Sequence, residues 1–388
     1  MLKSLVLVCA LTLSLPLWSQ LPARGSWTTD LSKKSINLSD LISGGPPKDG
    51  IPSVDNPKFI PQKAASWLSP KELVLSIAIH GEARAYPLQI LMWHELVNDT
   101  VAGEPILASY CPLCNSGIIF SRKVDGKVLE FGVSGMLRNS DMVMYDRQTD
   151  SLWQQITGEG IVGGYTGSTL RMLPAQMIPF DAFRASYPDG LVLSRDTGFQ
   201  RDYGRNPYRG YEWGSGPIMP MSRKTSSALN GMEKLVVVSD RKGYRAYPFS
   251  YLKKGPVVED KAAGENIVVF FTPEGLSPVD AVDMSKSRAT GAVGVFSPVV
   301  EGKRLRFRSK GNTIVDKETG SRWLVTGEAV EGTLKGKRLN PVEHGVYFTF
   351  AWLAFQPQTF VYGVPLSSPS DGLEPPSREG GSGAWLCP

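Results

Sequence analysis

The chain has 388 residues, which is enough for two or three domains with hydrophobic cores of their own. Its formal net charge of +5 is small for that length, and no dense run of Lys and Arg appears, so the sequence lacks the basic footprint of a nucleic-acid-binding protein. The 40 glycines, 29 prolines and many short apolar runs indicate a turn-rich, mainly β protein.

The chain begins like an exported protein. Residues 1–3 (MLK) carry a positive charge, and the apolar run from Leu5 to Trp18 is too short to span a bilayer. We therefore expect residues 1–20 to be a signal peptide and the protein to be periplasmic or secreted. An uncleaved membrane anchor is the alternative. No later segment is long and apolar enough to span, so we expect no membrane span after signal cleavage.

Signal cleavage changes the number of cysteines. It removes Cys9 and leaves Cys111, Cys114 and Cys387, an odd number in an oxidising compartment. One thiol must then be unpaired, bound to something or joined to another chain. Cys387 lies in residues 365–388, which we expect to form a flexible tail, and we interpret it as a free thiol or an intermolecular link.

Residues 67–195 are interpreted as one mainly β unit. Alternating apolar residues predict its strands, a proline opens its first helix, and Asp125-Gly126 is a favoured two-residue hairpin turn. The expected elements are a strand at 72–80, a short helix from Pro87 to about Val97, a strand from Ile106 to Cys111, a hairpin at 118–133, two strands around 145–153 and a short helix at 179–187.

The same unit occurs twice. Residues 84–87 (RAYP) recur at 245–248, and the string TGE at 157–159 recurs at 326–328. Seven such blocks keep their order, which chance does not produce. We expect residues 229–364 to repeat the first unit, with an insertion near 276–290 that forms a surface loop. The predicted fold is mainly β with a few short helices (α+β), a tandem duplication of a small antiparallel β unit.

The inter-repeat segment, residues 196–228, does not have the composition of a flexible linker. It is rich in aromatic residues and Arg, whereas flexible linkers are rich in Ser, Gly or charged residues. We expect this segment to pack across both units and to form a wall of the functional site.

The string YCPLCNSG at residues 110–117 is the sharpest local signal. A Cys-x-x-Cys pair brings Cys111 and Cys114 within reach of one metal ion or of each other. Three states remain open: a metal site, a redox-active dithiol and a structural disulfide. A thioredoxin-like site is not expected, because a β-rich stretch follows the second cysteine where that fold has a helix.

His94 is the third candidate ligand. It shares a mostly apolar helix face with Ile90 and Val97, so a satisfied core histidine is the alternative. The second unit lacks all three polar residues: in the alignment of the two units the counterparts of His94, Cys111 and Cys114 are Gly255, Thr272 and Gly275. Two thiolates and one imidazole suit zinc or copper with an open position.

Further polar residues are interpreted in two groups. Arg138, Asp141 and Gln154 lack clear counterparts in the second unit, and we expect them to line a pocket beside the thiols. Asp146 and Trp153 do have counterparts, so we interpret them as an Asp in a turn and a packed indole. Met136, Met142 and Met144 are candidate thioether ligands, with core packing as the alternative.

Three strings give the region from about residue 67 to residue 362 a resemblance to a known family: YCPLCNSG at 110–117, YDRQT at 145–149 followed by Trp153, and DYGRNPY at 202–208. The region resembles an uncharacterised bacterial and archaeal family, domain-of-unknown-function family 3179. The family name carries no activity, so the resemblance implies no catalytic residue.

Two functional hypotheses follow from the sequence. The sequence leaves open whether the protein is an enzyme. In the first, an exported protein binds copper or zinc, or handles redox equivalents, through Cys111, Cys114 and His94. In the second, the protein is a non-catalytic envelope module. Its aromatic, Arg-rich inter-repeat segment and paired β units bind an envelope protein or a small anionic ligand, and its cysteines form a structural disulfide. Neither hypothesis involves nucleic acid.

Overall fold

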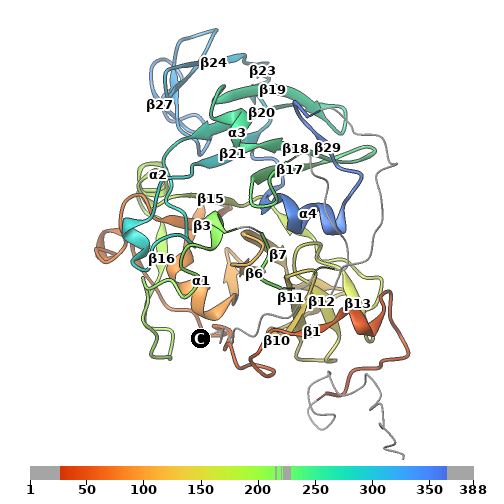
Figure 1. Cartoon of the computed structure of the whole chain (residues 1–388). Helices are drawn as coiled ribbons and strands as arrows, with labels where there is room; N and C mark the ends of the chain where they lie inside the picture. Colours follow the sequence, from red (N-terminus) through yellow and green to blue (C-terminus); the bar gives the residue numbers. More distant parts are fainter. Residues whose placement is uncertain (1–26, 215, 220, 222–228, 365–388) are drawn as a thin grey trace, which may run out of the picture.

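The computed structural model describes residues 27–214, 216–219, 221 and 229–364, and Figure 1 shows their arrangement. The expected signal peptide, Cys9, Cys387 and the expected tail lie outside the described residues. Strands make up 42% of the structure and helices 11%, so the predicted mainly β fold with a few short helices is confirmed. Among the described helices, none has the length and hydrophobicity to cross a bilayer.

The first half of the chain forms three sheets and a small hairpin. The strand orders are β15-β3-β4-β16-β2, β14-β7-β6-β5 and β1-β10-β11-β12-β13, with β8-β9 as the hairpin. The bounds are β1 Ile42–Ser43, β2 Phe59–Pro61, β3 Leu73–Ile79, β4 Glu82–Pro87, α1 Leu88–His94, β5 Leu96–Val101, β6 Glu104–Cys111, β7 Ser116–Ser121, β8 Lys123–Val124, β9 Lys127–Val128, β10 Phe131–Arg138, β11 Asp141–Asp146, β12 Leu152–Gln154, β13 Gly160–Val162, β14 Met172–Leu173, β15 Gln176–Pro179, α2 Phe180–Ser186 and β16 Leu191–Leu193.

The second half has sheets of order β28-β17-β18-β29, β19-β20-β21 and β24-β25-β26-β27, with the hairpin β22-β23. The bounds are β17 Lys234–Asp240, β18 Gly243–Pro248, α3 Phe249–Leu252, β19 Val257–Ala262, β20 Glu265–Thr272, β21 Ala292–Phe296, β22 Val299–Val300, β23 Lys303–Arg304, β24 Phe307–Lys310, β25 Thr313–Asp316, β26 Arg322–Trp323, β27 Ala329–Glu331, β28 His344–Phe348, α4 Thr349–Phe355 and β29 Phe360–Val361. Short 3-10 turns are η3 Leu38–Asp40, η4 Gln62–Ala64, η5 Tyr211–Trp213 and η6 Met284–Lys286.

The two halves share one order of elements. Each starts with a hairpin, β3-β4 or β17-β18, that has an antiparallel strand on one side (β15 or β28) and a parallel strand on the other (β16 or β29). In each half a helix follows the hairpin, and a second helix follows the antiparallel strand. The meander β5-β6-β7 corresponds to β19-β20-β21, and β10 to β13 correspond to β24 to β27. This recurrence agrees with the repeated blocks of the sequence.

One turn shows the correspondence in atomic detail. In the first half the buried carboxylate of Asp146 accepts hydrogen bonds from the Thr149 amide at 2.7 Å and from the Trp153 indole at 3.0 Å. In the second half Asp316 accepts the same two bonds, from Thr319 and Trp323, at 2.6 and 3.0 Å. Asp146 and Trp153 therefore have the structural role predicted for them, which is to close a tight turn and to hold a buried indole.

We expect Asp146→Ala and Asp316→Ala to destabilise the protein by similar amounts, about 2 kcal/mol each. Each substitution leaves a buried indole N–H without a partner, and a buried donor without a partner costs about 1–3 kcal/mol. Urea denaturation of both variants measures the two losses. A large loss for one variant and none for the other would contradict the shared role.

The halves are not separate globules with separate cores. β7 of the first half packs against β28 of the second, and β15 of the first packs against β21 of the second. Since β7 corresponds to β21 and β15 to β28, the contact is reciprocal, as a pseudo-twofold relation requires. Both large hydrophobic clusters contain residues of both halves. Figure 1 shows the second half, green to blue, lying along the first across this contact.

The described part of the inter-repeat segment packs as expected across the two halves. The Tyr211 hydroxyl donates to the carbonyl of Leu113 in the first half at 3.0 Å, and the Asn206 amide donates to the carbonyl of Val282 in the second half at 2.8 Å. The insertion near residues 276–290 is more than a surface loop, because Val279 and Met284 are buried in the core. It docks on the inter-repeat segment, where the Met284 amide donates to the Gly204 carbonyl at 2.9 Å.

Candidate functional site

The Cys-x-x-Cys pair lies in the turn that joins β6 to β7. Cys111 is the last residue of β6 and pairs with Ser116, the first residue of β7. The Cys114 amide donates to the Cys111 carbonyl at 3.3 Å, and Asn115 has a left-handed backbone with φ of 53°. The pair therefore lies in a β turn and not at the start of a helix, which fits the expectation that the site is not thioredoxin-like.

Cys111, Cys114 and Asp141 form the candidate metal centre. One ligand atom from each, the two Sγ atoms and a carboxylate oxygen, lie within 4.8 Å of one another, and all three residues are buried. Both cysteines are free thiols in the structure. The Cys114 thiol donates to the Ser140 carbonyl at 3.3 Å.

A tight turn brings Asp141 to the thiols. Arg138 and Asp141 pair across β10 and β11, and the two residues between them, Asn139 and Ser140, both have left-handed backbones with φ of 51° and 64°. Such a two-residue turn matches the twist of a hairpin but is strained for a residue such as Ser. It fixes both the Ser140 carbonyl and the Asp141 carboxylate beside the sulfurs.

Burial governs the ionisation of the centre. It raises the pKa of Cys111 and raises that of Cys114 well above the usual thiol range. It also raises the pKa of Asp141 to about 7, against the hydrogen bonds that its Oδ2 accepts from Gln154 at 2.7 Å and from the Ile156 amide at 2.9 Å. The Asp141 Oδ1 atom is buried and has no hydrogen-bond partner among the described residues. Burial therefore favours the uncharged thiol form of both cysteines, and it favours the uncharged form of Asp141 below about pH 7.

Glu95 is a buried acid that the sequence interpretation missed. It follows the last residue of α1 and has an unusual backbone conformation, with φ of 58° and ψ of −36°. Burial, and then the negative charge of Asp141, raise its pKa to about 8. Strain of this kind often lies at functional sites. An acid at the end of an apolar helix, with Pro256 as its counterpart in the second unit, was the available signal.

His94 is not brought into this group. Its Nδ1 lies 2.8 Å from the Pro52 carbonyl and its Nε2 lies 2.6 Å from the Tyr203 hydroxyl, so both ring nitrogens have partners away from the thiols. Its ring also lies beside those of Phe199 and Tyr203. The structure therefore places Asp141, and not His94, next to the two cysteines.

The three predicted pocket residues form a chain that holds the centre. The Arg138 guanidinium donates to Gln154 at 3.3 Å, and Gln154 donates to Asp141. Arg138 also lies 4.0 Å from Asp40 and over the ring of Phe355 in the second half. Met136, Met142 and Met144 are buried in hydrophobic clusters.

Parts distant in sequence cover the Cys-x-x-Cys turn. The Phe348 amide of β28 donates to the Cys114 carbonyl at 2.9 Å, and Tyr211 donates to Leu113 as described above. The second half and the inter-repeat segment therefore close the centre off from solvent. The second half itself has Thr272 and Gly275 where the first has the two cysteines.

Comparison with known proteins gives one result. The family described as "Protein of unknown function (DUF3179)" matches residues 48–359. No curated protein matches the chain, and no solved structure matches it.

Proposed function

The chain belongs to this family of proteins of unknown function, DUF3179, and we propose that it binds a zinc ion through Cys111, Cys114 and Asp141. The family description assigns no activity, so the proposal is argued from the geometry alone. The observation that carries the proposal is the convergence of two thiols and one carboxylate oxygen within 4.8 Å in the buried interior. Burying a charge or an unpaired polar atom costs free energy of folding unless another group interacts with it. A cation bound between the two sulfurs and the carboxylate oxygen would interact favourably with all three atoms at once.

The chemistry of the donors favours zinc over copper. Zinc accepts thiolate and carboxylate ligands together, whereas copper(I) prefers soft sulfur ligands alone. The unpaired Oδ1 of Asp141 is the atom suited to coordination, because Oδ2 already accepts two hydrogen bonds. A bound cation would displace the thiol protons and lower the pKa values that burial raises. Glu95 is a further buried acid that interacts with the centre, because, in addition to burial, the charge of Asp141 raises its pKa and its own charge raises the pKa of Cys111.

A second candidate function is thiol–disulfide exchange, and one observation favours it. The two thiols are reduced, adjacent and in contact with a carboxyl group that can accept a proton. The reaction would join the two sulfurs and convert a disulfide substrate into two thiols. Against it, Cys114 is fully buried and Cys111 is 1% exposed, whereas exchange needs an accessible thiolate.

The two functions are separated by metal analysis and a thiol count on protein purified from the periplasm. The periplasm is chosen because the N-terminal sequence supports export. We expect about one zinc per chain, retained through gel filtration and lost in Cys111→Ser/Cys114→Ser. The control Asp189→Asn, an exposed acid, should keep the metal. Metal-free protein whose two thiols react readily with a small aromatic disulfide would sink the zinc proposal and support exchange.

A further inference from the structure

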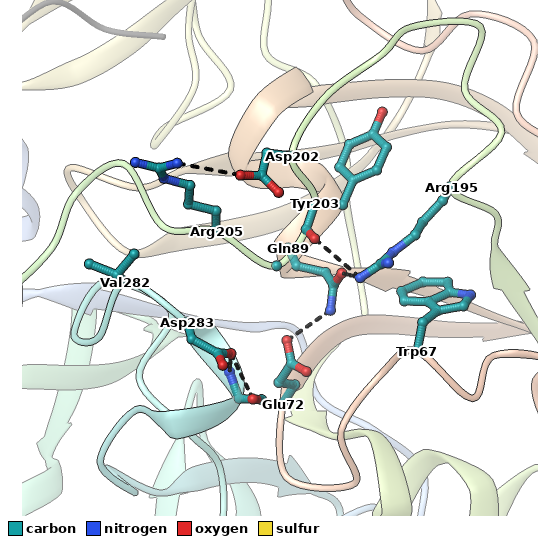
Figure 2. A pocket seen from close by; sticks show the side chains of 11 residues that line it. Trp67, Glu72, Gln89, Arg195, Asp202, Tyr203, Arg205, Val282 and Asp283 are labelled. Carbon is teal, nitrogen blue, oxygen red and sulfur yellow. Dashed lines mark hydrogen bonds and ion pairs between the residues drawn. The ribbon is translucent and has the colours of Figure 1, made fainter.

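A second site lies apart from the thiols, in a cavity of about 380 Å³ between the two halves (Figure 2). This volume is within the range of small-molecule sites. Its walls come from three parts of the chain: the first half, the inter-repeat segment and the insertion of the second half. The residues that line it include Trp67, Glu72, Gln89, Arg195, Val282 and Asp283.

The inner wall is a chain of polar side chains that fix one another. Gln89 donates to Glu72 at 2.8 Å and accepts from Arg195 at 2.5 Å. Arg195 also donates to the Tyr203 carbonyl at 3.2 Å, and its guanidinium lies 4.4 Å from the centre of the Trp67 ring. Glu72 and Gln89 are buried, so the wall is already in place before any ligand arrives.

One polar atom of this wall is left without a partner. The Arg195 Nε is buried, with no hydrogen-bond partner among the described residues. Arg195 lines the cavity, and this unpaired donor shows that the protein does not use the full hydrogen-bonding capacity of its side chain. The wall thus offers a donor at Arg195, an acceptor at Glu72 and both kinds of group at Gln89.

The charges of the lining are balanced within the protein. Asp202 lies 3.6 Å from Arg205, Asp283 lies 3.2 Å from Lys286, and Glu72 is joined to Arg195 through Gln89. The lining has three acids and two arginines, so no excess of positive charge remains to attract a phosphate or another anionic ligand. Trp67 and the exposed Val282 add apolar surface next to the polar wall.

We propose that this cavity binds a neutral polyhydroxylated molecule of the size of a small saccharide. Neighbouring hydroxyl groups both donate and accept, which matches Arg195, Gln89 and Glu72, and the C–H faces of a sugar ring match Trp67 and Val282. The cavity shares no residue with the candidate metal centre, so this inference does not depend on the zinc proposal.

Saturation-transfer NMR on the full chain tests the proposal. The probes are D-glucose, N-acetyl-D-glucosamine and maltose, and glycine and inorganic phosphate serve as comparison compounds. We expect transfer to at least one saccharide and none to glycine or phosphate. Gln89→Ser, which installs the residue found at the corresponding position 250, should weaken the binding about tenfold by removing the bridge of the wall. Val282→Glu, at an exposed position, should abolish it by filling the cavity with charge.

The matched control is Ser250→Gln, the reverse change in the second half, which should leave binding unchanged. Circular dichroism of each variant checks that the fold is kept. If Gln89→Ser does not fold, Val282→Glu decides alone. No transfer to any of the three saccharides, binding that both cavity variants leave intact, or binding of glycine or phosphate in place of saccharide would each overturn the proposal.

Discussion

Removal of zinc is expected to lower the free energy of unfolding by about 4 kcal/mol relative to protein held at a free zinc concentration about a thousandfold above Kd. The reason is that the proposed ligands Cys111, Cys114 and Asp141 come together only in the folded chain, so that binding free energy adds to folding free energy. β6, β7, β10 and β11 meet at the centre, and β28 is bonded to the Cys-x-x-Cys turn, so the loss should be felt by both halves. Urea denaturation with added zinc and with EDTA measures the difference.

Asp141→Asn is the informative variant in this experiment. It keeps the size of the side chain and the acceptor oxygen that bonds to Gln154 and Ile156, but it removes the charged ligand oxygen. We therefore expect EDTA to have little effect on this variant. Asp189→Asn should respond to EDTA like the wild type. An equal response of all three proteins, or none in the wild type, would rule out a stabilising ion at the centre.

The position of the cysteine pair could be predicted from the sequence, but the side chain that lies beside it could not. The second unit acts as an internal control, and the absence of both cysteines from it singled out residues 110–117. In the sequence, His94 is a candidate third ligand because its helix leads into the strand that ends at Cys111. The helix ends at His94, and the backbone of Glu95 has a positive φ, so the chain changes direction between them. The side chains of His94 and Glu95 therefore enter different surroundings. Tyr203, more than a hundred residues away, takes the second ring nitrogen of His94.

The sequence indicates Asp141 as a pocket residue, and only the tight turn at 139–140 shows why it lies beside the sulfurs. Turn geometry of this kind follows weakly from sequence, since Asn-Ser is not the Asn-Gly pair that marks such turns. The order of the helices and strands was easier to predict, because the repeated blocks show the same order in both units. The reciprocal packing of the halves was not, since the same apolar strand pattern suits a core within one unit or a core shared by two.

The second large effect that we expect is a pH dependence of stability caused by His344. This residue is buried at the start of β28, its Nδ1 lies 2.7 Å from the Val342 carbonyl, and its Nε2 has no partner among the described residues. Burial lowers its pKa from 6.5 to about 4, against the bond to Val342. The corresponding residue of the first half is Ala175, which shows that the unit does not need a histidine there.

The sign follows from where the proton binds. Well above pH 6.5 this histidine is unprotonated in both the folded and the unfolded chain, and its contribution to stability is fully present. Between pH 6.5 and about 4 the unfolded chain binds a proton that the folded chain does not, so stability falls as the pH falls, by up to about 3 kcal/mol at pH 4. Asp141 and Glu95, whose folded pKa values are raised, act in the opposite direction, because stability falls as the pH rises through their range.

The difference between two proteins isolates the histidine from these acids. Urea denaturation of wild type and His344→Ala in EDTA, from pH 4 to pH 8, should give two curves whose separation is constant above pH 6.5 and shifts by up to about 3 kcal/mol in favour of the variant toward pH 4. His344→Ala also leaves a small cavity, which lowers its curve by the same amount at every pH and so does not alter the shift. His80→Asn, at an exposed position, should follow the wild type throughout. Parallel curves for wild type and His344→Ala across the whole range would show that His344 is protonated as readily in the folded chain as in the unfolded one.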